Sequence, residues 1–316
     1  MSLNRRQFLA TSSLAAAVSA VDLRSLLASA PQASRATQTP PATAFVSLRG
    51  TVGCFTGRGG TIGWHIDKTS VVVVDAQFPD TAKICLAGLN ERSGSRPVDF
   101  LVNTHHHGDH TAGNVVFRPV ARKIVAQVNE PRLQLEAAAQ AAKNARPGAA
   151  APAEPVVADT TYEKTWRETV GGEVLALKYY GPAHTGGDSI VTFEKSGVVH
   201  MGDLVFHRIH PYIDKPAGAS IGNWIKALEA VKADHPKDTV FVFGHAGAKF
   251  QPTGSGADLL YMRDYLTALL EFVRGEIKAG KSKETILKIT DPLRGFPDHG
   301  PLIERVLSAA YEELAG

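Results

Sequence analysis

The segment from Thr104 to His110 reads Thr-His-His-His-Gly-Asp-His, so four histidines and one aspartate lie within six positions. Neutral imidazole and carboxylate groups are the nitrogen and oxygen ligands of a metal such as zinc. Without an ion, so dense a cluster costs solvation energy when it is buried, and its charged members repel one another. The segment therefore constrains the fold strongly, because the chain must gather these side chains around a metal site.

The flanking residues place this segment at the end of a strand. Residues 98–102 (Val-Asp-Phe-Leu-Val) have the pattern of a buried strand, and residues 109–114 can open the following helix. In an extended chain His105 and His107 point to one side, and His106 points elsewhere. Gly108 then permits a turn that swings the next two side chains toward a second position.

The rest of the chain alternates between strands and helices. Strands are predicted over residues 45–55, 61–66 and 70–75, and an amphipathic helix over residues 220–233. The last sixty residues are mostly helical in pattern, and no repeat of fixed period occurs. We therefore expect one catalytic domain over residues 44–316.

Three more candidate ligands follow where predicted strands run into loops beside glycines. His184 lies in Pro-Ala-His-Thr-Gly-Gly, Asp203 in His-Met-Gly-Asp and His245 in Phe-Gly-His-Ala-Gly. Loops of this kind often carry functional side chains, although a single histidine at a strand end is more often a surface or hydrogen-bonded residue. The order and context of all the sites together indicate one centre.

The motif His-x-His-x-Asp-His, met without substitution by residues 105–110, and the three later candidates in their order resemble the metallo-β-lactamase-fold superfamily of metallohydrolases. The resemblance covers residues 75–247, and Asp75 is similar to the family's early structural aspartate. It implies an α+β fold, a four-layer αβ/βα sandwich of two facing mixed β-sheets with the metals at one edge.

The resemblance also implies ligands for two zinc ions, with iron or manganese as alternative metals. Carried over residue by residue, the ligands are His105, His107 and His184 for one ion, Asp109, His110 and His245 for the other, and Asp203 between them. Two such ions lower the pKa of a shared water, whose hydroxide attacks the carbonyl carbon of a small-molecule ester, thioester, lactone or lactam. Asp109 is also the expected catalytic residue, because it can orient this nucleophile.

Side chains just after the bridging aspartate are candidates for substrate contacts. His207 and His210 are expected to line the pocket, although a solvated loop explains them equally well. Tyr212 and Asp214 lie in a loop that can reach the substrate. His106 is expected to lie behind the ligands or at the surface.

Departures from subfamily patterns narrow the reaction. The most familiar zinc β-lactamases place a cysteine where this chain has Asp203, and neither Cys54 nor Cys85 fills that role by position. β-Lactamase activity proper is therefore an alternative. Acyl-homoserine lactonases carry a tyrosine at the position of Phe206. The remaining alternatives are a mono-iron oxidoreductase such as a sulfur dioxygenase, and a non-catalytic metal-binding protein.

The amino-terminal residues differ in composition from the rest. Arg5 and Arg6 precede a Phe-Leu pair, an apolar alanine-rich run and a small-residue exit, which together resemble a twin-arginine export signal over residues 1–30. A flexible leader is expected over residues 31–43. The expected location is the periplasm or the exterior, and the apolar run is too short to span a membrane. The alternative is an amphipathic amino-terminal helix.

Composition excludes some classes of partner. A hydrophobic fraction of 44%, a charged fraction of 21% and a net charge of +3 are typical of a globular protein. No basic stripe with interleaved aromatic residues is present, so nucleic acid is not an expected partner. Neither the individual substrate nor the oligomeric state follows from the sequence.

Overall fold

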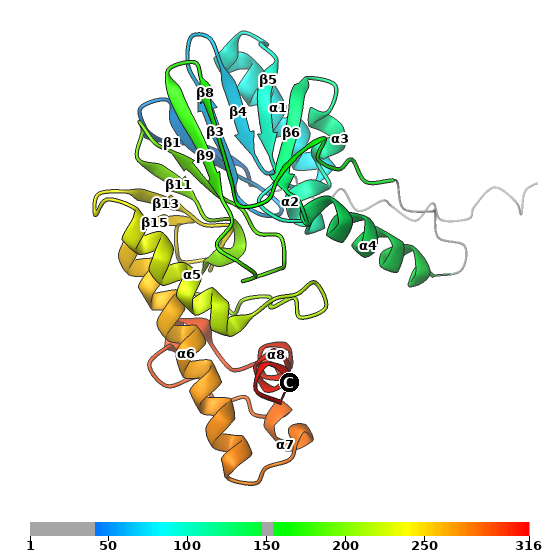
Figure 1. The fold of residues 1–316 in the computed structure, drawn as a ribbon, viewed down its shortest axis with the longest axis vertical. Helices are drawn as coiled ribbons and strands as arrows, with labels where there is room; N and C mark the ends of the chain where they lie inside the picture. Colours follow the sequence, from blue (N-terminus) through cyan, green and yellow to red (C-terminus); the bar gives the residue numbers. More distant parts are fainter. Residues whose placement is uncertain (1–41, 147–153, 316) are drawn as a thin grey trace, which may run out of the picture. The chain divides into compact units, whose positions relative to one another are not determined.

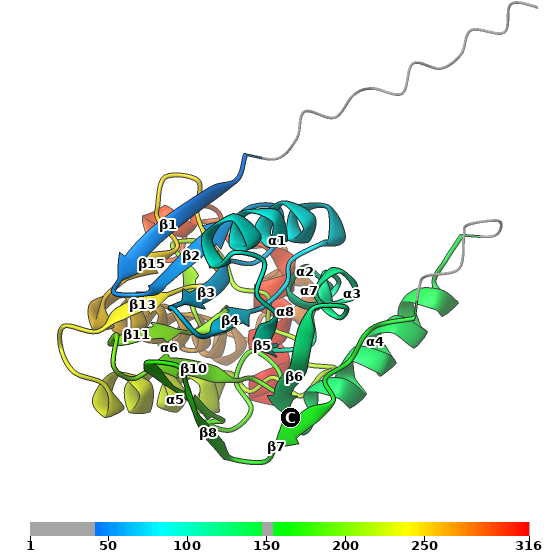
Figure 2. The same cartoon turned by 90° about the horizontal axis from the view of Figure 1, so that it is seen from above.

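The computed structural model describes residues 42–146 and 154–315, which form two facing β-sheets with helices on their outer surfaces (Figures 1 and 2). The predicted export signal, and the predicted leader apart from its last two residues, lie outside the described residues. No helix within the described part of the chain is long and apolar enough to cross a membrane.

The first sheet has seven strands in chain order, antiparallel from β1 to β4 and parallel from β4 to β7. Parallel strands have their carboxyl ends at one edge of a sheet, and the histidine-rich segment follows one of them. The strands are β1 (Ala44–Arg49), β2 (Val52–Thr56), β3 (Ile62–Ile66), β4 (Val71–Val74), β5 (Val98–Val102), β6 (Ala121–Gln127) and β7 (Thr160–Tyr162).

The second sheet has six strands in the order β15-β13-β11-β10-β9-β8, with one parallel pair, β11 and β13. A separate parallel pair, β12 with β14, lies beside the metal-competent residues described below. The strands are β8 (Thr165–Val170), β9 (Glu173–Lys178), β10 (Ile190–Phe193), β11 (Val198–His200), β12 (Phe206–His207), β13 (Val240–Val242), β14 (His245–Ala246) and β15 (Thr253–Gly254).

Alternating valines on β4 show how one strand serves two layers. Successive side chains on a strand point to opposite faces, so Val72 and Val74 pack between the sheets while Val71 and Val73 pack under the helices. The inner layer is completed by residues of the second sheet such as Leu177. An uninterrupted apolar run is typical of a strand buried on both faces.

Helices cover both outer faces. α1 (Pro79–Ser93) and α3 (Asn114–Phe117) lie on the first sheet, while α5 (Ile221–Asp234) and α6 (Gly256–Lys278) lie on the second (Figure 2). Ser255 and Asp258 form a capping box that starts α6. These layers are the αβ/βα sandwich that the sequence predicts.

Further helices extend from the sandwich. α7 (Lys283–Leu287) and α8 (Glu304–Ala315) pack with α6 in the same apolar cluster as α5. The 3-10 turn η2 (Pro297–His299) contacts α6 through the His299 ring, which stacks on that of Tyr265 at 4.1 Å. α4 (Glu130–Lys143) follows β6 and buries residues only in its first turn and a half, so its second half projects from the sheets (Figures 1 and 2).

One strand prediction was wrong. The pattern over residues 45–55 predicts a single strand, but the chain turns at Gly50 and forms the β1–β2 hairpin, in which Phe45 pairs with Phe55. Gly50 has a φ of 58°, in the left-handed region where glycine carries no steric penalty. Both halves have strand character, so their composition does not reveal the reversal.

Candidate metal centre

The predicted ligands converge at one edge of the two sheets from five separate segments. His105 and His107 follow β5, Asp109 and His110 lie in α2 (Gly108–Thr111), and His184 lies between β9 and β10. Asp203 lies in the 3-10 turn η1 (Gly202–Leu204) after β11, and His245 begins β14. Two clusters with metal-ligand spacing result, His105–His107–His184–Asp203 and Asp109–His110–His245.

The first cluster has the spacing of ligands around one ion. His107 Nδ1 lies 3.0 Å from His105 Nε2 and 3.0 Å from His184 Nε2. Donors of a tetrahedral ion with bonds of about 2.1 Å stand about 3.4 Å apart. The observed separations are slightly shorter, so a small outward movement of the rings suffices for the three nitrogens to hold one ion.

Hydrogen bonds on the far side of two rings assign their tautomers. His184 Nδ1–H donates to the Tyr212 carbonyl oxygen at 2.8 Å, and His107 Nε2–H donates to Asp214 Oδ2 at 2.9 Å. The nitrogens that face each other, His184 Nε2 and His107 Nδ1, therefore both carry lone pairs. Two lone pairs at this distance repel unless a cation lies between them, so the arrangement fits a metal ion.

Asp75 orients the third ring and one ring of the second cluster. It is fully buried, and its Oδ1 accepts the Thr104 backbone N–H at 2.8 Å. Its Oδ2 accepts Thr104 Oγ–H at 2.8 Å and His110 Nδ1–H at 2.7 Å. The Thr104 oxygen in turn accepts His105 Nδ1–H at 3.0 Å, so both histidines direct Nε2 into the site.

The second cluster contains a carboxylate and two imidazoles. His245 Nε2 lies 3.1 Å from Asp109 Oδ2 and 3.4 Å from His110 Nε2. Asp109 is partly exposed while His110 is fully buried. This mixed nitrogen and oxygen set is suited to a second divalent ion.

Asp203 lies between the clusters. Its Oδ2 is 3.8 Å from His105 Nε2 and 3.6 Å from His184 Nε2. The same carboxylate reaches the second cluster, with Oδ1 3.1 Å from His110 Nε2 and Oδ2 3.3 Å from His245 Nε2. One carboxylate therefore contacts both groups of candidate ligands.

Electrostatics differ between the two clusters. Burial lowers the pKa of His105 well below its usual range, and burial together with His107 lowers the pKa of His184 to about 3. Burial also disfavours a charged His245, but the carboxylates of Asp203 and Asp109 raise its pKa to about 9. His105 and His184 are thus neutral ligands, whereas His245 of the second cluster holds a proton that a divalent ion would displace.

A pocket of about 460 Å³ opens onto both clusters. It is lined by His107, Gly108, Asp109, Asp203, Phe206, Ile209, His210, Tyr212, His245 and Arg305. Tyr212 has 42% of its surface exposed, and its ring lies 5.3 Å from that of His107. The pocket therefore presents aromatic walls beside the candidate ligands.

The two histidines predicted to contact substrate have other partners. His210 lines the pocket, but its ring is held by the Tyr265 hydroxyl at 2.7 Å and the Pro301 carbonyl at 2.8 Å. His207 is not among the lining residues. Its Nδ1–H donates to the Gln251 carbonyl oxygen at 2.7 Å, and its Nε2 lies 3.3 Å from Asp258.

Asp214 has a position that sequence reasoning did not foresee. It was expected beside the substrate, but its carboxylate lies behind His107 and 3.5 Å from His106 Nε2. His106 is buried, with 4% of its surface exposed, and it forms a third metal-competent group with His107 and Asp214. The one signal in the sequence was the loop that contains Tyr212 and Asp214, which was expected to lie near the site.

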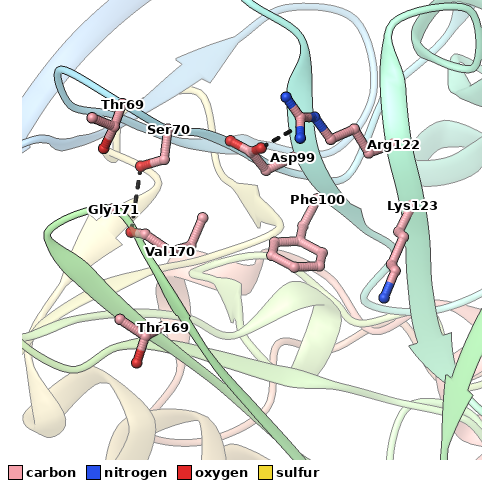
Figure 3. A pocket seen from close by; sticks show the side chains of 9 residues that line it. All are labelled: Thr69, Ser70, Asp99, Phe100, Arg122, Lys123, Thr169, Val170 and Gly171. Atoms are coloured by element: carbon pink, nitrogen blue, oxygen red, sulfur yellow. Dashed lines mark hydrogen bonds and ion pairs between the residues drawn. The ribbon is translucent and has the colours of Figure 1, made fainter.

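A second pocket, of about 350 Å³, lies where β4, β5 and β6 begin and β8 ends (Figure 3). It is therefore at the other edge of the sheets. Arg122 lies 3.4 Å from Asp99, and Ser70 Oγ donates to the Val170 carbonyl oxygen at 3.3 Å. It is lined by Thr69, Ser70, Asp99, Phe100, Arg122, Lys123, Thr169, Val170 and Gly171, without a histidine or cysteine.

Fold and site together define a metal-binding protein built on an αβ/βα sandwich. Residues 58–245, more than half of the chain, match the family model of the metallo-beta-lactamase superfamily. The chain belongs to this superfamily.

Individual relatives are distant. Metallo-beta-lactamase IND-1 of Chryseobacterium indologenes is 24% identical over 211 residues, which are 65% of this chain and 80% of that protein. A metallo-beta-lactamase structure from Pontibacter korlensis is 19% identical with a TM-score of 0.57, covering 72% of this chain and 99% of that one. A double mutant of the sec-alkyl sulfatase PisA1 is 16% identical with a TM-score of 0.64, covering 87% of this chain and 50% of that one. The two structural matches show a shared fold.

Proposed function

We propose that this protein is a hydrolase that uses two divalent metal ions to cleave a small carbonyl compound. The observation that carries the proposal is the convergence of three imidazole lone pairs at one point, next to a second cluster of two imidazoles and a carboxylate. Asp203 contacts both clusters. Membership of a superfamily rich in metallohydrolases supports the same conclusion.

Each ligand has a role in this proposal. His105, His107 and His184 hold one ion, Asp109, His110 and His245 hold the other, and Asp203 bridges them. When bound, such a pair of ions polarises a carbonyl oxygen and lowers the pKa of a shared water. Nitrogen and oxygen ligands of this kind favour zinc, with iron and manganese as alternatives.

Asp109 has a second role at the pocket. Burial would raise its pKa, but the hydrogen bond with His245 and the neighbouring His110 lower it to about 2, so its carboxylate stays ionised. Its side chain is 30% exposed and lines the pocket. It can therefore accept a hydrogen bond from the attacking water and orient a lone pair toward the carbonyl carbon.

The proposed substrates are esters, thioesters, lactones and lactams. A β-lactam is one member of this set, and the name of the relative from Chryseobacterium indologenes favours testing it. Asp203 stands where the most familiar zinc β-lactamases have cysteine, so β-lactamase activity remains the narrower alternative.

The test combines metal analysis with a substrate panel. We expect close to two metal ions per chain by mass spectrometry, and hydrolysis of nitrocefin, a thioester, a lactone or an aryl ester that a chelator abolishes and zinc restores. One iron per chain with oxygen uptake would instead establish the oxidoreductase alternative. Bound metal without turnover of any of the four substrates would favour the non-catalytic alternative.

We also propose that residues 1–30 direct export of the folded protein. The arginine pair supports this, because twin-arginine signals depend on it. Replacing Arg5 and Arg6 together by lysine should leave the protein in the cytoplasm of a bacterial host, as measured by fractionation. Unchanged export of the double variant would contradict the proposal.

A further inference from the structure

Another cavity, distinct from the two pockets described above, adjoins the metal pocket. This groove of about 490 Å³ lies between α4 and the short helices α2 and α3, and is called the α4 groove below. Its apolar lining consists chiefly of Ala112, Val115, Ala137, Ala138, Ala141 and Val156. A groove with such walls favours an apolar occupant.

Small side chains on α4 create this space. The residues that α4 buries are Glu130, Leu133 and Gln134, all near its start. A helix that packs on a protein body presents large apolar residues on its inner face, but the later groove-facing positions of α4 are alanines. Across the groove, Val115 keeps 54% of its surface exposed. Both walls therefore offer apolar surface that the described residues leave uncovered.

The groove and the metal pocket meet at Gly108. It lines both cavities, with His107 beside it in the metal pocket and His106 beside it in the groove. A Cβ added at Gly108 would meet nothing within 4 Å, and its φ is outside the left-handed region. Neither local packing nor backbone conformation requires glycine here, and the two cavities therefore meet at a residue that has no side chain.

The polar residues of the groove include two buried atoms that lack a partner. His106 Nδ1 and Gln134 Oε1 have no hydrogen-bond partner among the described residues, and these residues are only 4% and 5% exposed. Such atoms are costly to bury without a partner.

We propose that the α4 groove binds an unbranched apolar chain attached to the substrate's carbonyl carbon, with the carbonyl itself in the metal pocket. This inference rests on the proposed hydrolase function and narrows its substrates to long-chain acyl compounds. In the metal pocket Gly108 lies between His107 and Asp109, so a chain that extends from the attacked carbon past Gly108 would enter the groove.

The experiment compares p-nitrophenyl esters from acetate to decanoate with the zinc-loaded protein. We expect kcat/KM to rise about fourfold per added methylene until the groove is full. In Ala138→Trp, which fills the groove, this gain should disappear. Ala139→Trp is the matched control, because Ala139 is exposed on the same helix but does not line the groove. Ala141→Trp serves as a second filling variant should Ala138→Trp fail to fold.

Binding of decanoate and acetate by calorimetry separates this inference from the hydrolase proposal. Tighter binding of decanoate in the parent and Ala139→Trp, but not in Ala138→Trp, supports the groove even where no ester is hydrolysed. Hydrolysis that does not depend on acyl length, with equal decanoate binding in both variants, would overturn the groove assignment and leave the hydrolase intact. A dependence on the length of the alcohol alone would also overturn it.

Discussion

Single residues behind the ligands determine what the candidate site can hold. In four of the histidines, the ring nitrogen that faces away from the centre makes a hydrogen bond. The partners are Thr104, Asp75, Asp214 and the Tyr212 carbonyl oxygen. Because the outward nitrogen of each ring is fixed by a hydrogen bond, the other nitrogen is directed at the centre before an ion arrives. Metal affinity should therefore depend on side chains that never touch the metal.

Asp214 provides the clearest test of this dependence. Asp214→Ala removes the acceptor for His107 Nε2–H, so the ring loses both its tautomer and its orientation. We expect a 10- to 100-fold loss of zinc affinity, measured by competition with a chromophoric chelator, and a smaller loss for Asp214→Asn, which keeps an acceptor oxygen. Asp291→Asn at an exposed position is the control. Equal affinity of Asp214→Ala and the parent would contradict the assigned role.

Glu130 predicts a pH dependence of stability away from the ligands. Burial and the nearby Asp75 raise its pKa from 4.5 to about 8, and neither carboxylate oxygen has a partner among the described residues. The folded protein keeps this carboxyl protonated up to about pH 8, whereas the unfolded chain ionises it above pH 4.5. The group therefore stabilises the fold at low pH, and its contribution is lost as pH rises between these values.

The corresponding variant is Glu130→Gln, a neutral side chain of the same shape. Its free energy of unfolding should rise relative to the parent by about 1.4 kcal/mol for each pH unit between pH 5 and pH 8. Urea denaturation at four pH values measures this difference. Parallel pH profiles of parent and variant would show that Glu130 is ionised in the folded protein.

The sequence predicted which candidate ligands come together more fully than it predicted the residues that support them. The seven candidate ligands have chemically distinctive side chains in a fixed order, so their meeting could be expected from the motif. Asp214 and Glu130 carry no such signal, because one carboxylate among 31 acidic residues acquires its role only from the fold. His106 shows the same limit, since its burial depends on a loop more than a hundred residues away.

At the scale of elements, close approach of two loops positions Asp203 between the two clusters. Gly244, between β13 and β14, donates its N–H to the Gly202 carbonyl oxygen at 2.8 Å. A Cβ added at Gly244 would lie 1.9 Å from Asp203 Oδ1 and 2.8 Å from the Gly202 carbonyl oxygen. The turn η1 can therefore approach β14 only because residue 244 has no side chain.

Gly244→Ala should consequently displace Asp203. We expect loss of the bridged pair of ions, seen as one or no zinc per chain, together with a fall in turnover of at least a hundredfold. Gly275→Ala is the matched control, because its Cβ would meet nothing within 4 Å in the last turn of α6. That change should stabilise the helix by up to about 1 kcal/mol. Two zinc ions in purified Gly244→Ala would refute the steric argument.

For the molecule as a whole, the resemblance carried by the histidine motif implied the two-sheet sandwich, while alternating and continuous apolar runs indicated only its individual strands and helices. They were not sufficient for the carboxyl-terminal region, where the apolar stripe of α6 indicates a helix but not its neighbours. Its packing depends on long-range contacts, such as those of Leu266 and Leu307 in one cluster. This region lies beyond the family match at residues 58–245, yet its Arg305 reaches the metal pocket.

Arg305 gives the carboxyl-terminal helices a role in substrate choice. Its side chain lines the pocket, donates to the His210 carbonyl oxygen at 3.4 Å and forms no ion pair within the described part of the chain. An unpaired guanidinium beside a pocket attracts anions. Arg305→Glu should lower kcat/KM at least tenfold for substrates with a free carboxylate relative to neutral esters, and the difference should shrink at 1 M salt. Arg294→Glu changes an exposed residue outside the pocket. It should leave kcat/KM unchanged both for substrates with a free carboxylate and for neutral esters. An equal effect on charged and neutral substrates would show that Arg305 supports the fold rather than selects the substrate.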